Sequence, residues 1–541
     1  MTLEQIAQIA NTTLDDENSV IFSNYKEAIE RWLNSAEFSM GGGGKFSKLY
    51  PPLLNPAQIN YANSDPVLCW ILNIPLPNTF DFIVFGSHAA SLHSAVPAFM
   101  GICGAFNIAL NRKKIDKEKG ANAASTNTNR QNYIDIFKNL LLVPQAKEKL
   151  GFKKCFLQLS DFLLDDDAAK FYALVPRKDA LLVTRDPISA LKAVCHVQNR
   201  PDLMLLGGEV FGAGVNFSIS TKDYYDRNLK YSNSDDLEKD KKYEPVLSSD
   251  KNIFGDAPLL SKGKIKRWLL DREQTFHDGQ VFKLLKDRIY RLKIKLTSDF
   301  INASATMKEL SQFFDLDYKD SDLYNKRVSD LKYFTPLRIY ANATMPLFSE
   351  IAEPLSDDKD LDASKRLRIT KEEAKNSIIL HLSTHFDKRV LITKNKGAQS
   401  SGDISEYFST LGDDFVVFLE NPSLRANFLA DKELIKKAQF YIDKASKEIL
   451  QKAKNEKTKH LKEKDILEFL AKNKDLRDLC ALVLKAHLSF LRAYKPDILE
   501  NFKFYNDFLL LCKDDKNIEI CDEYKDEIEK MKKFGLDKLL F

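Results

Sequence analysis

A short polar segment, Gly86-Ser87-His88, has residue types suited to phosphate binding. It follows residues 80–85 (FDFIVF), an apolar and aromatic run typical of a buried strand in a parallel sheet. A helix expected from about Ala89 would present unpaired N–H groups and the positive end of its dipole to an anion. Gly86 permits close backbone approach, and the Ser87 hydroxyl can cap the helix or donate to a phosphate oxygen. A capped helix without a ligand is the alternative.

A second segment places Arg185 at the end of another expected strand, residues 181–184 (LLVT). Open α/β sheets bind ligands at the carboxyl ends of their strands, and a guanidinium can hold phosphate with two parallel donors. Asp186 can orient Arg185 or cap a helix expected from about Ile188, in which Ser189 adds a hydroxyl. The alternative is an Arg185–Asp186 salt bridge beside a capped helix. The candidate phosphate-binding residues of both segments are Gly86, Ser87, His88, Ala89, Ser91, Arg185 and Ser189.

Transfer of a group to a hydroxyl needs a general base, and histidine titrates near neutral pH. His88 lies within the first segment and is the first candidate for a catalytic base. His277, beside Asp278, is the second. His381 and His385 are four residues apart but lack an obvious third ligand, and the seven cysteines include no Cys-x-x-Cys pair. We therefore expect no metal site and no bound cofactor.

Two strand–turn–helix units in one region predict an α/β fold, with a parallel sheet flanked by helices. We expect a helical N-terminal segment at residues 1–75 and a catalytic α/β domain at residues 76–425. Residues 426–541 are rich in lysine and glutamate with helical periodicity, which predicts a helical C-terminal region. Polar stretches near 111–131 and 221–250 are expected insertions at the surface, each a solvated loop, a lid or an acceptor-binding loop.

The remaining part of the α/β region has weaker patterns. Residues 260–345 are expected to be mainly helical and to end in a strand at 337–341. Further strands are expected at 377–382, 389–393 and 415–419, where short apolar runs occur.

The composition excludes several other classes of protein. The 541 residues are 44% hydrophobic and 29% charged, which is typical of a folded globular protein. The formal net charge of +4 is small and mixed along the chain, so we expect no nucleic-acid partner. No apolar run approaches the roughly 18 to 20 residues that a membrane span needs, and the first residues lack a secretory-signal pattern. We expect a protein of the cytoplasm, with the inner face of the inner membrane as a further possible location.

The two polar segments together resemble the nucleotide-binding pair of the sulfotransferase fold, over roughly residues 78–200. In that family the first loop holds the 5′-phosphate of the donor, and the arginine binds its 3′-phosphate. The first loop here has no lysine, and Ala193 stands where a phosphate-binding serine is expected, with Ser189 one turn earlier. These departures argue against a sulfate donor.

The whole chain is more similar to the capsular O-methyl phosphoramidate transferases of Gram-negative bacteria. The resemblance rests on the N-terminal segment with Gly41 to Gly44, on the block IVFGSHAAS at 83–91 and on the block RDPIS at 185–189. It implies a cytidine-nucleotide donor that carries a methyl phosphoramidate group and a 3′-phosphate. It also implies a hydroxyl of a capsular polysaccharide, or of its sugar precursor, as acceptor, and peripheral association with the capsule-assembly machinery.

Four glycine codons in an otherwise AT-biased sequence are typical of a G tract that slips during replication, and so of a phase-variable gene. A flexible loop is the structural alternative for Gly41 to Gly44. The rival functions are a carbohydrate sulfotransferase that uses adenosine 3′-phosphate 5′-phosphosulfate, a nucleotide-sugar glycosyltransferase of capsule synthesis, and a non-enzymatic scaffold for capsule assembly.

Overall fold

The structure of the chain is a computed structural model. It describes residues 1–41, 46–92, 94–109, 128–160, 164–196, 260–270, 276–326, 378–386, 402–419, 422–458 and 460–512, and the short segments 209–211, 215–217, 229–230, 246–247, 328, 331, 337–341, 348–351 and 390–391.

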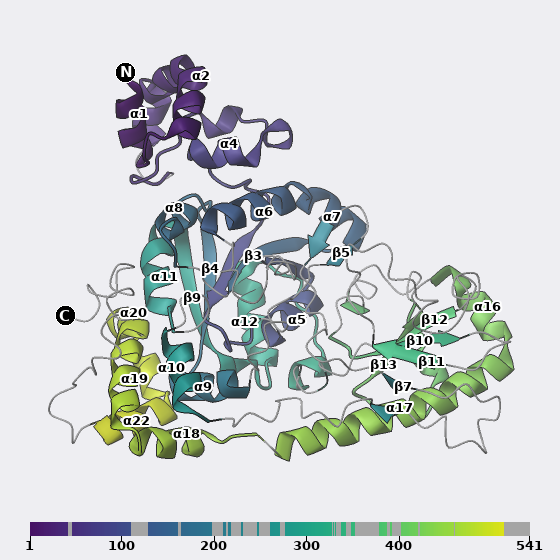
Figure 1. Ribbon diagram of the computed structural model, residues 1–541. Coiled ribbons are helices and arrows are strands. Elements are labelled where there is room, and N and C mark those ends of the chain that lie inside the picture. Colours follow the sequence, from purple (N-terminus) through teal and green to yellow (C-terminus); the bar gives the residue numbers. More distant parts are fainter. Residues whose placement is uncertain are drawn as a thin grey trace.

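A parallel sheet of five strands lies at the centre of the described structure (Figure 1). Its strands, in spatial order, are β2 (Ala105–Ala109), β3 (Lys154–Ser160), β1 (Phe82–Gly86), β4 (Lys178–Thr184) and β9 (Ile289–Leu296). After β1 the chain continues to β2, at one edge of the sheet, and after β4 it continues to β9, at the opposite edge. The carboxyl ends of β1 and β4 therefore meet at a topological switch point, where open α/β sheets bind ligands. The expected α/β fold with a parallel sheet flanked by helices is confirmed.

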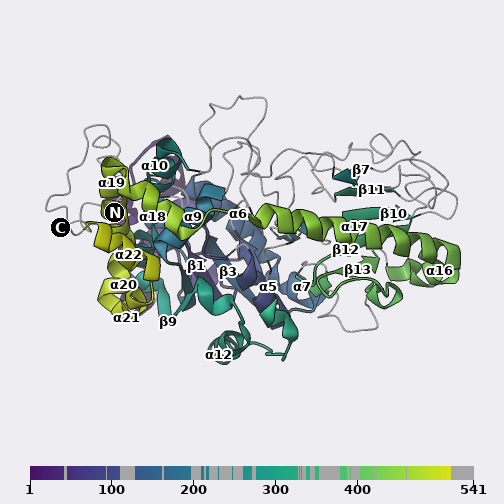
Figure 2. The ribbon, with the colours of Figure 1, turned by 90° about the horizontal axis from the view of Figure 1, so that it is seen from below.

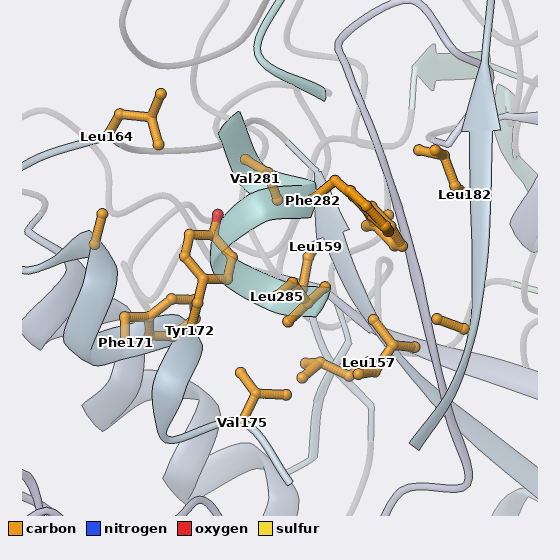
Figure 3. Close-up of a cluster of buried hydrophobic side chains, with 14 of the residues drawn as sticks. Leu157, Leu159, Leu164, Phe171, Tyr172, Val175, Leu182, Val281, Phe282 and Leu285 are labelled. Carbon is orange, nitrogen blue, oxygen red and sulfur yellow. The ribbon is translucent and has the colours of Figure 1, made fainter. Parts of the chain in front are cut away.

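The two faces of this sheet pack into separate hydrophobic cores, because successive side chains of a strand point to opposite faces. Ile83 and Phe85 of β1 belong to the first core, and Phe82 and Val84 belong to the second. Figure 3 shows part of the first core, where side chains of β3 and β4 face two helices: Leu157, Leu159 and Leu182 lie near Phe171, Tyr172, Val281, Phe282 and Leu285.

Helices contribute to both cores. Those of the first core include α6 (Asn129–Leu141), α7 (Val143–Leu150), α8 (Ala168–Ala173), α9 (Pro187–His196), α10 (Lys262–Leu270) and α11 (Asp278–Leu285), together with helices of the N-terminal segment and of the C-terminal region. Those of the second core are α5 (Ala95–Ile102) and α12 (Ser304–Phe314). Short 3-10 turns lie at η1 (Pro56–Gln58), η2 (Tyr61–Asn63), η6 (Lys286–Arg288), η7 (Thr297–Phe300), η8 (Asp322–Asn325), η10 (Ser405–Tyr407) and η11 (Pro422–Leu424).

The N-terminal segment is helical, as expected. Its helices are α1 (Leu3–Ala10), α2 (Asp16–Leu33), α3 (Ala36–Gly41) and α4 (Pro66–Ile71). Trp70 of α4 packs on Tyr133 of α6, with ring centroids 5.3 Å apart. The segment therefore shares the first core of the sheet.

A second sheet of four antiparallel strands is found in the described part of the chain. Its order is β11 (Phe348–Ile351), β10 (Leu337–Ala341), β12 (Ile378–Ser383) and β13 (Val416–Leu419), and it packs with α16 (Arg425–Ala430) and α17 (Lys432–Thr458). The strands expected at 337–341, 377–382 and 415–419 are confirmed. Isolated two-stranded pairs are β5 (Glu209–Phe211) with β6 (Val215–Phe217), and β7 (Leu229–Lys230) with β8 (Val246–Leu247).

The C-terminal region is also helical within its described residues, as expected. Figure 2 shows α17 running from the second sheet toward a group of helices that we call the C-terminal helices. These are α18 (Glu463–Ala471), α19 (Lys474–His487), α20 (Ser489–Tyr494), α21 (Pro496–Glu500) and α22 (Lys503–Cys512), and they contact α9, α10 and α11. In the described part of the chain, no helix has the length and apolar character needed to cross a membrane.

Three expectations about local structure are wrong. The helix expected from about Ala89 begins at Ala95, because Ala89 and Ser91 have left-handed backbone angles that a right-handed helix excludes. The strand expected at 389–393 is helical at 390 and 391, since a short apolar run suits a buried helix as well as a strand. The mainly helical expectation for 260–345 missed β9. Most of both expected polar insertions, and the glycines from 42 to 44, lie outside the described residues.

Candidate phosphate-binding site

The loop between β1 and α5 lies at the carboxyl end of the central strand and is described at residues 87–92 and 94. Ala89 and Ser91 adopt φ angles of 67° and 64°, in the left-handed region that non-glycine residues rarely occupy. The carbonyl oxygen of Ser91 accepts the N–H of Val96 at 3.3 Å, which ties the loop to the first turn of α5. Residues held in such conformations cluster at ligand-binding sites, so this geometry favours a binding loop over a plain connection.

Gly86, the last residue of β1, lies against the backbone of β4. A Cβ atom at this position would lie 2.2 Å from the carbonyl oxygen of Val183 and 3.3 Å from Cδ1 of Leu92. No side chain larger than hydrogen fits there without movement of the β4 backbone. Glycine is therefore required by the packing of the two strands that carry the site, whether or not a ligand also approaches it.

Arg185 joins the end of β4 to the loop after β1. Its Nη1 donates a hydrogen bond to the carbonyl oxygen of Ala89 at 3.0 Å. The side chain is partly buried, and burial lowers its pKa while the charges of Glu463 and Asp186 oppose that shift. Among the described residues, no carboxylate forms a salt bridge with this guanidinium. A guanidinium remains charged in proteins, so its other N–H groups are suited to an anionic ligand.

Asp186 binds backbone amides rather than the neighbouring arginine. Its Oδ1 accepts the N–H groups of Ile188 at 2.9 Å and of Ser189 at 3.4 Å, which caps α9. Its Oδ2 accepts the N–H groups of Phe504 at 2.9 Å and of Tyr505 at 3.1 Å, at the start of α22. Burial raises the pKa of Asp186, and these four hydrogen bonds oppose the rise. One carboxylate thus joins the first turns of two helices.

Ser189 lies on α9 and faces the C-terminal helices. Its Oγ donates to Oε1 of Glu463 at 2.9 Å, and the Nζ of Lys192 contacts the same oxygen at 2.6 Å. Glu463 is the first residue of α18. The hydroxyl of Ser189 is engaged in this contact, and its role in phosphate binding stays a prediction.

His88 stacks on an aromatic side chain of α10. The rings of His88 and Trp268 have centroids 5.7 Å apart and planes inclined by 19°. Trp268 is buried, and its Nε1 has no hydrogen-bond partner among the residues that the structure describes. The His88 ring thus packs on a buried neighbour, and the N–H group of Trp268 is a donor close to the loop.

His277 is buried at the start of α11, and the residue that reaches the site from this position is Asp278. Oδ1 of Asp278 accepts the hydroxyl of Ser87 at 2.5 Å, and Oδ2 accepts the hydroxyl of Thr184 at 3.3 Å. Asp278 therefore bridges the ends of β1 and β4. Sequence reasoning noticed Asp278 only as a neighbour of His277, because its partners are distant in the sequence.

A second histidine lies behind this bridge. Nδ1 of His487, the last residue of α19, accepts the backbone N–H of Asp278 at 3.2 Å, and its Nε2 lies 3.8 Å from Oδ2. Burial lowers the pKa of His487 to about 3. The ring is therefore neutral at pH 7, and its accepting Nδ1 places the ring proton on Nε2. Burial raises the pKa of Asp278 to about 6, against the hydrogen bonds from Ser87 and Thr184.

The structure thus brings Gly86, Ser87, His88, Ala89 and Ser91 together with Arg185 at one edge of the sheet. His277 adjoins this group through Asp278, and Ser189 points to α18. Among the described side chains, no group of three His, Cys, Asp or Glu residues has the geometry of a metal site. The expected independence of metal stays a prediction.

Comparison with known proteins gives one match. Residues 301–514 match the model of a family described as "Protein of unknown function (DUF2972)". No curated protein and no solved structure matches the chain. The matched range includes α12, the second sheet and the C-terminal helices with His487, and it leaves out the loop at 87–94 and Arg185.

Proposed function

We propose that the protein transfers an O-methyl phosphoramidate group from a 3′-phosphorylated cytidine nucleotide to a hydroxyl of a capsular sugar. The observation that carries the transferase assignment is the position of Arg185. Its partly buried guanidinium has no salt bridge among the described residues and contacts the loop after β1 at the switch point of the sheet. This arrangement supports an anionic ligand, and a nucleotide phosphate is the anion that such sheet edges commonly bind.

In this proposal, the residues that bind the donor differ from the residue that accepts the proton of the acceptor hydroxyl. Arg185 and the amides of the loop hold donor phosphates and stabilise the negative charge that develops on the leaving phosphate. The acceptor hydroxyl attacks phosphorus, the bond from phosphorus to the nucleotide phosphate breaks, and His88 takes the hydroxyl proton. The contact with Trp268 fixes the ring of His88 for this role. His277 is the second candidate for the base.

The identity of the transferred group rests on the sequence resemblance, together with a fold that can bind a nucleotide. We include in the proposal a reaction in the cytoplasm or at the inner face of the inner membrane, peripheral contact with the capsule-assembly machinery, and a gene that is switched by slippage in its glycine tract.

The decisive experiment compares capsules from strains with and without this gene by mass spectrometry. We expect loss of methyl phosphoramidate with no other change in the polysaccharide. Loss of sulfate would support a sulfotransferase, and loss of a sugar would support a glycosyltransferase.

Ligand-induced thermal stabilisation of the purified protein adds a second test. We expect cytidine 3′,5′-bisphosphate to raise the melting temperature more than its adenosine analogue. A response to nucleotide sugars that ignores the 3′-phosphate would indicate a glycosyltransferase. A scaffold protein would respond to none of these nucleotides.

A further inference from the structure

The hydroxyl of Ser87 is already committed within the protein. A serine hydroxyl has one proton to donate, and that of Ser87 is directed at Oδ1 of Asp278, 2.5 Å away. Thr184 directs its hydroxyl proton at the other oxygen of the same carboxylate. All three side chains are buried, with exposed fractions of 7% for Ser87, 0% for Thr184 and 1% for Asp278. Water therefore does not compensate for a rearrangement of this group.

An anion in the loop of residues 87–92 creates two conflicts with this arrangement. Ser87 cannot donate its proton to the anion while it donates to an ionised Asp278. The anion would also lie about two hydrogen-bond lengths from a buried carboxylate, and two like charges at that distance disfavour each other's ionised form. Both conflicts are removed when Asp278 takes up a proton, because the neutral acid donates to Oγ of Ser87 and the serine proton turns to the anion.

We propose that Asp278 is a positioning residue of the anion site, and that an anion bound by the loop of residues 87–92 enters together with one proton that is held on Asp278. The proposal rests on the phosphate site of the proposed function and extends it. Asp278 does not touch the ligand. It acts through Ser87, whose hydroxyl changes from a donor to the protein into a donor to the bound phosphate.

The other ionisable groups around Asp278 do not offer a better place for this proton. Burial holds the pKa of His487, from α19, at about 3, so this ring stays neutral. His277 precedes Asp278 on the same turn, and its charge would favour the ionised carboxylate. His88 lies in the loop and Arg185 at the end of β4, where the guanidinium is already charged. Since burial raises the pKa of Asp278 to about 6, protonation near neutral pH is accessible.

The test is isothermal titration calorimetry of the full chain with inorganic sulfate and with cytidine 3′,5′-bisphosphate. Sulfate is included because it does not titrate in the range used, whereas a phosphate group itself titrates near pH 6. Titrations at several pH values from about 5.5 to 8, each in two buffers of different ionisation enthalpy, report the protons taken up per bound anion. Above the pKa of the free carboxyl, we expect about one proton per sulfate and an affinity that falls roughly tenfold for each pH unit.

Three variants separate the positioning role from a structural one. Asp278→Asn should bind sulfate without proton uptake and with little dependence on pH. Ser87→Ala should bind it several-fold more weakly at pH 6, because the donor is lost. Lys283→Gln, a control on the exposed face of the same helix α11, should keep the uptake. If Asp278→Asn does not fold, the wild-type difference infrared spectrum decides, since the proposal requires a protonated carboxyl band to appear on sulfate binding.

Sulfate affinity that is equal at pH 6 and pH 8 with no proton uptake would overturn this inference, as would uptake that persists in Asp278→Asn. Cytidine bisphosphate that binds without uptake would contradict the role of Asp278 alone and leave the proposed donor intact. Sulfate binding with uptake but no binding of the nucleotide would support the role of Asp278 and contradict the proposed donor. Failure of both anions to bind at every pH would contradict both proposals.

Discussion

Nη1 of Arg185 lies 3.0 Å from the carbonyl oxygen of Ala89, so the end of β4 is tied directly to the loop that follows β1. One N–H group of the guanidinium makes this contact, and its other N–H groups have no partner among the described residues, which leaves them for a ligand. The contact therefore fixes the direction from which an anion can meet both the arginine and the loop.

Replacement of Arg185 by alanine is expected to erase the preference for a nucleotide with a 3′-phosphate. A charge-assisted hydrogen bond contributes about 1.5 to 3 kcal/mol, which corresponds to roughly 10- to 150-fold in affinity. Arg185→Lys should recover only part of this, because it keeps the charge but loses the planar fork. Calorimetry with cytidine 5′-monophosphate and cytidine 3′,5′-bisphosphate measures the preference.

Arg177 provides the matched control, because it precedes the amino end of the same strand and stacks on Tyr290, 4.5 Å from the ring centroid. Arg177→Ala should leave the preference unchanged. A folded Arg185→Ala protein that still prefers the 3′-phosphate would remove the main support for the phosphate site.

Replacement of His88 by asparagine is expected to reduce turnover by roughly 10²- to 10⁴-fold, with a much smaller effect on donor binding. His88→Phe tests the stacking on Trp268 separately, because phenylalanine keeps an aromatic ring but has no proton acceptor. If His88 is the base, both variants lose activity. An active His88→Phe enzyme would reduce the role of His88 to packing and would make His277 the next candidate.

Gly86→Ala is expected to destabilise the fold by about 1 to 3 kcal/mol or more, because the added methyl group would overlap the carbonyl oxygen of Val183. Urea denaturation measures the free energy of unfolding. Gly412→Ala is the control, since a Cβ atom there has nothing within 4 Å. Equal stability of the two variants would show that β1 and β4 do not approach as closely as described.

The contributions of Asp278 and His487 to the pH dependence of the free energy of unfolding should cancel each other. The stability that Asp278 contributes is present below its ordinary pKa of 3.8 and is lost as pH rises toward its folded value of about 6. The stability that His487 contributes is present above its ordinary pKa of 6.5 and is lost as pH falls toward about 3. Between roughly pH 4 and 6 the folded and unfolded chains each bind one proton on this pair, so the two slopes oppose each other.

Single substitutions remove that balance in opposite directions. Asp278→Asn should lose about 2 to 3 kcal/mol of stability, relative to wild type, as pH falls from 6 to 4. His487→Gln should gain stability over the same change. Urea denaturation at pH 4, 5 and 6 measures both slopes, and parallel pH profiles for the two variants would contradict the assigned protonation states.

Transfer activity is expected to survive prolonged treatment with EDTA. Arg185, the loop amides and the helix termini are expected to stabilise the donor charge in place of a divalent ion. The measurement is turnover before and after treatment, with added Mg²⁺ and Mn²⁺ as controls. Activity that disappears with the chelator and returns with an ion would refute this expectation.

The sequence was most informative where the signal is local. A compact apolar run followed by turn residues predicted β1 and β4, and Pro187 with Asp186 before it marked the start of α9 within one residue. β9 was missed although its pattern is regular. Arg291 and Lys293 alternate with partly buried apolar residues, and they pair with Asp179 and Glu309 as expected on an edge strand. A search for period two would have found this strand.

The central carboxylate of the site could not be predicted in this way. Ser87 and Asp278 are 191 residues apart, and Asp278 and His487 are 209 residues apart. No periodicity or spacing rule connects such positions, because the contacts depend on how the sheet and the C-terminal helices pack. The left-handed angles of Ala89 and Ser91 were equally hidden, since neither residue type signals that conformation.

The hydrogen bonds of Asp186 with Phe504 and Tyr505 determine when the site can be completed during synthesis of the chain. Phe504 and Tyr505 are 318 and 319 residues away from Asp186. Two of the four hydrogen bonds of this carboxylate therefore cannot form until the ribosome has completed the intervening chain. The first core of the sheet also contains side chains of the C-terminal helices, so both this core and the edge that carries the site are completed only after these helices have been made. A nascent or truncated chain can therefore contain every residue of the loop and of β4 and still have an unfinished site.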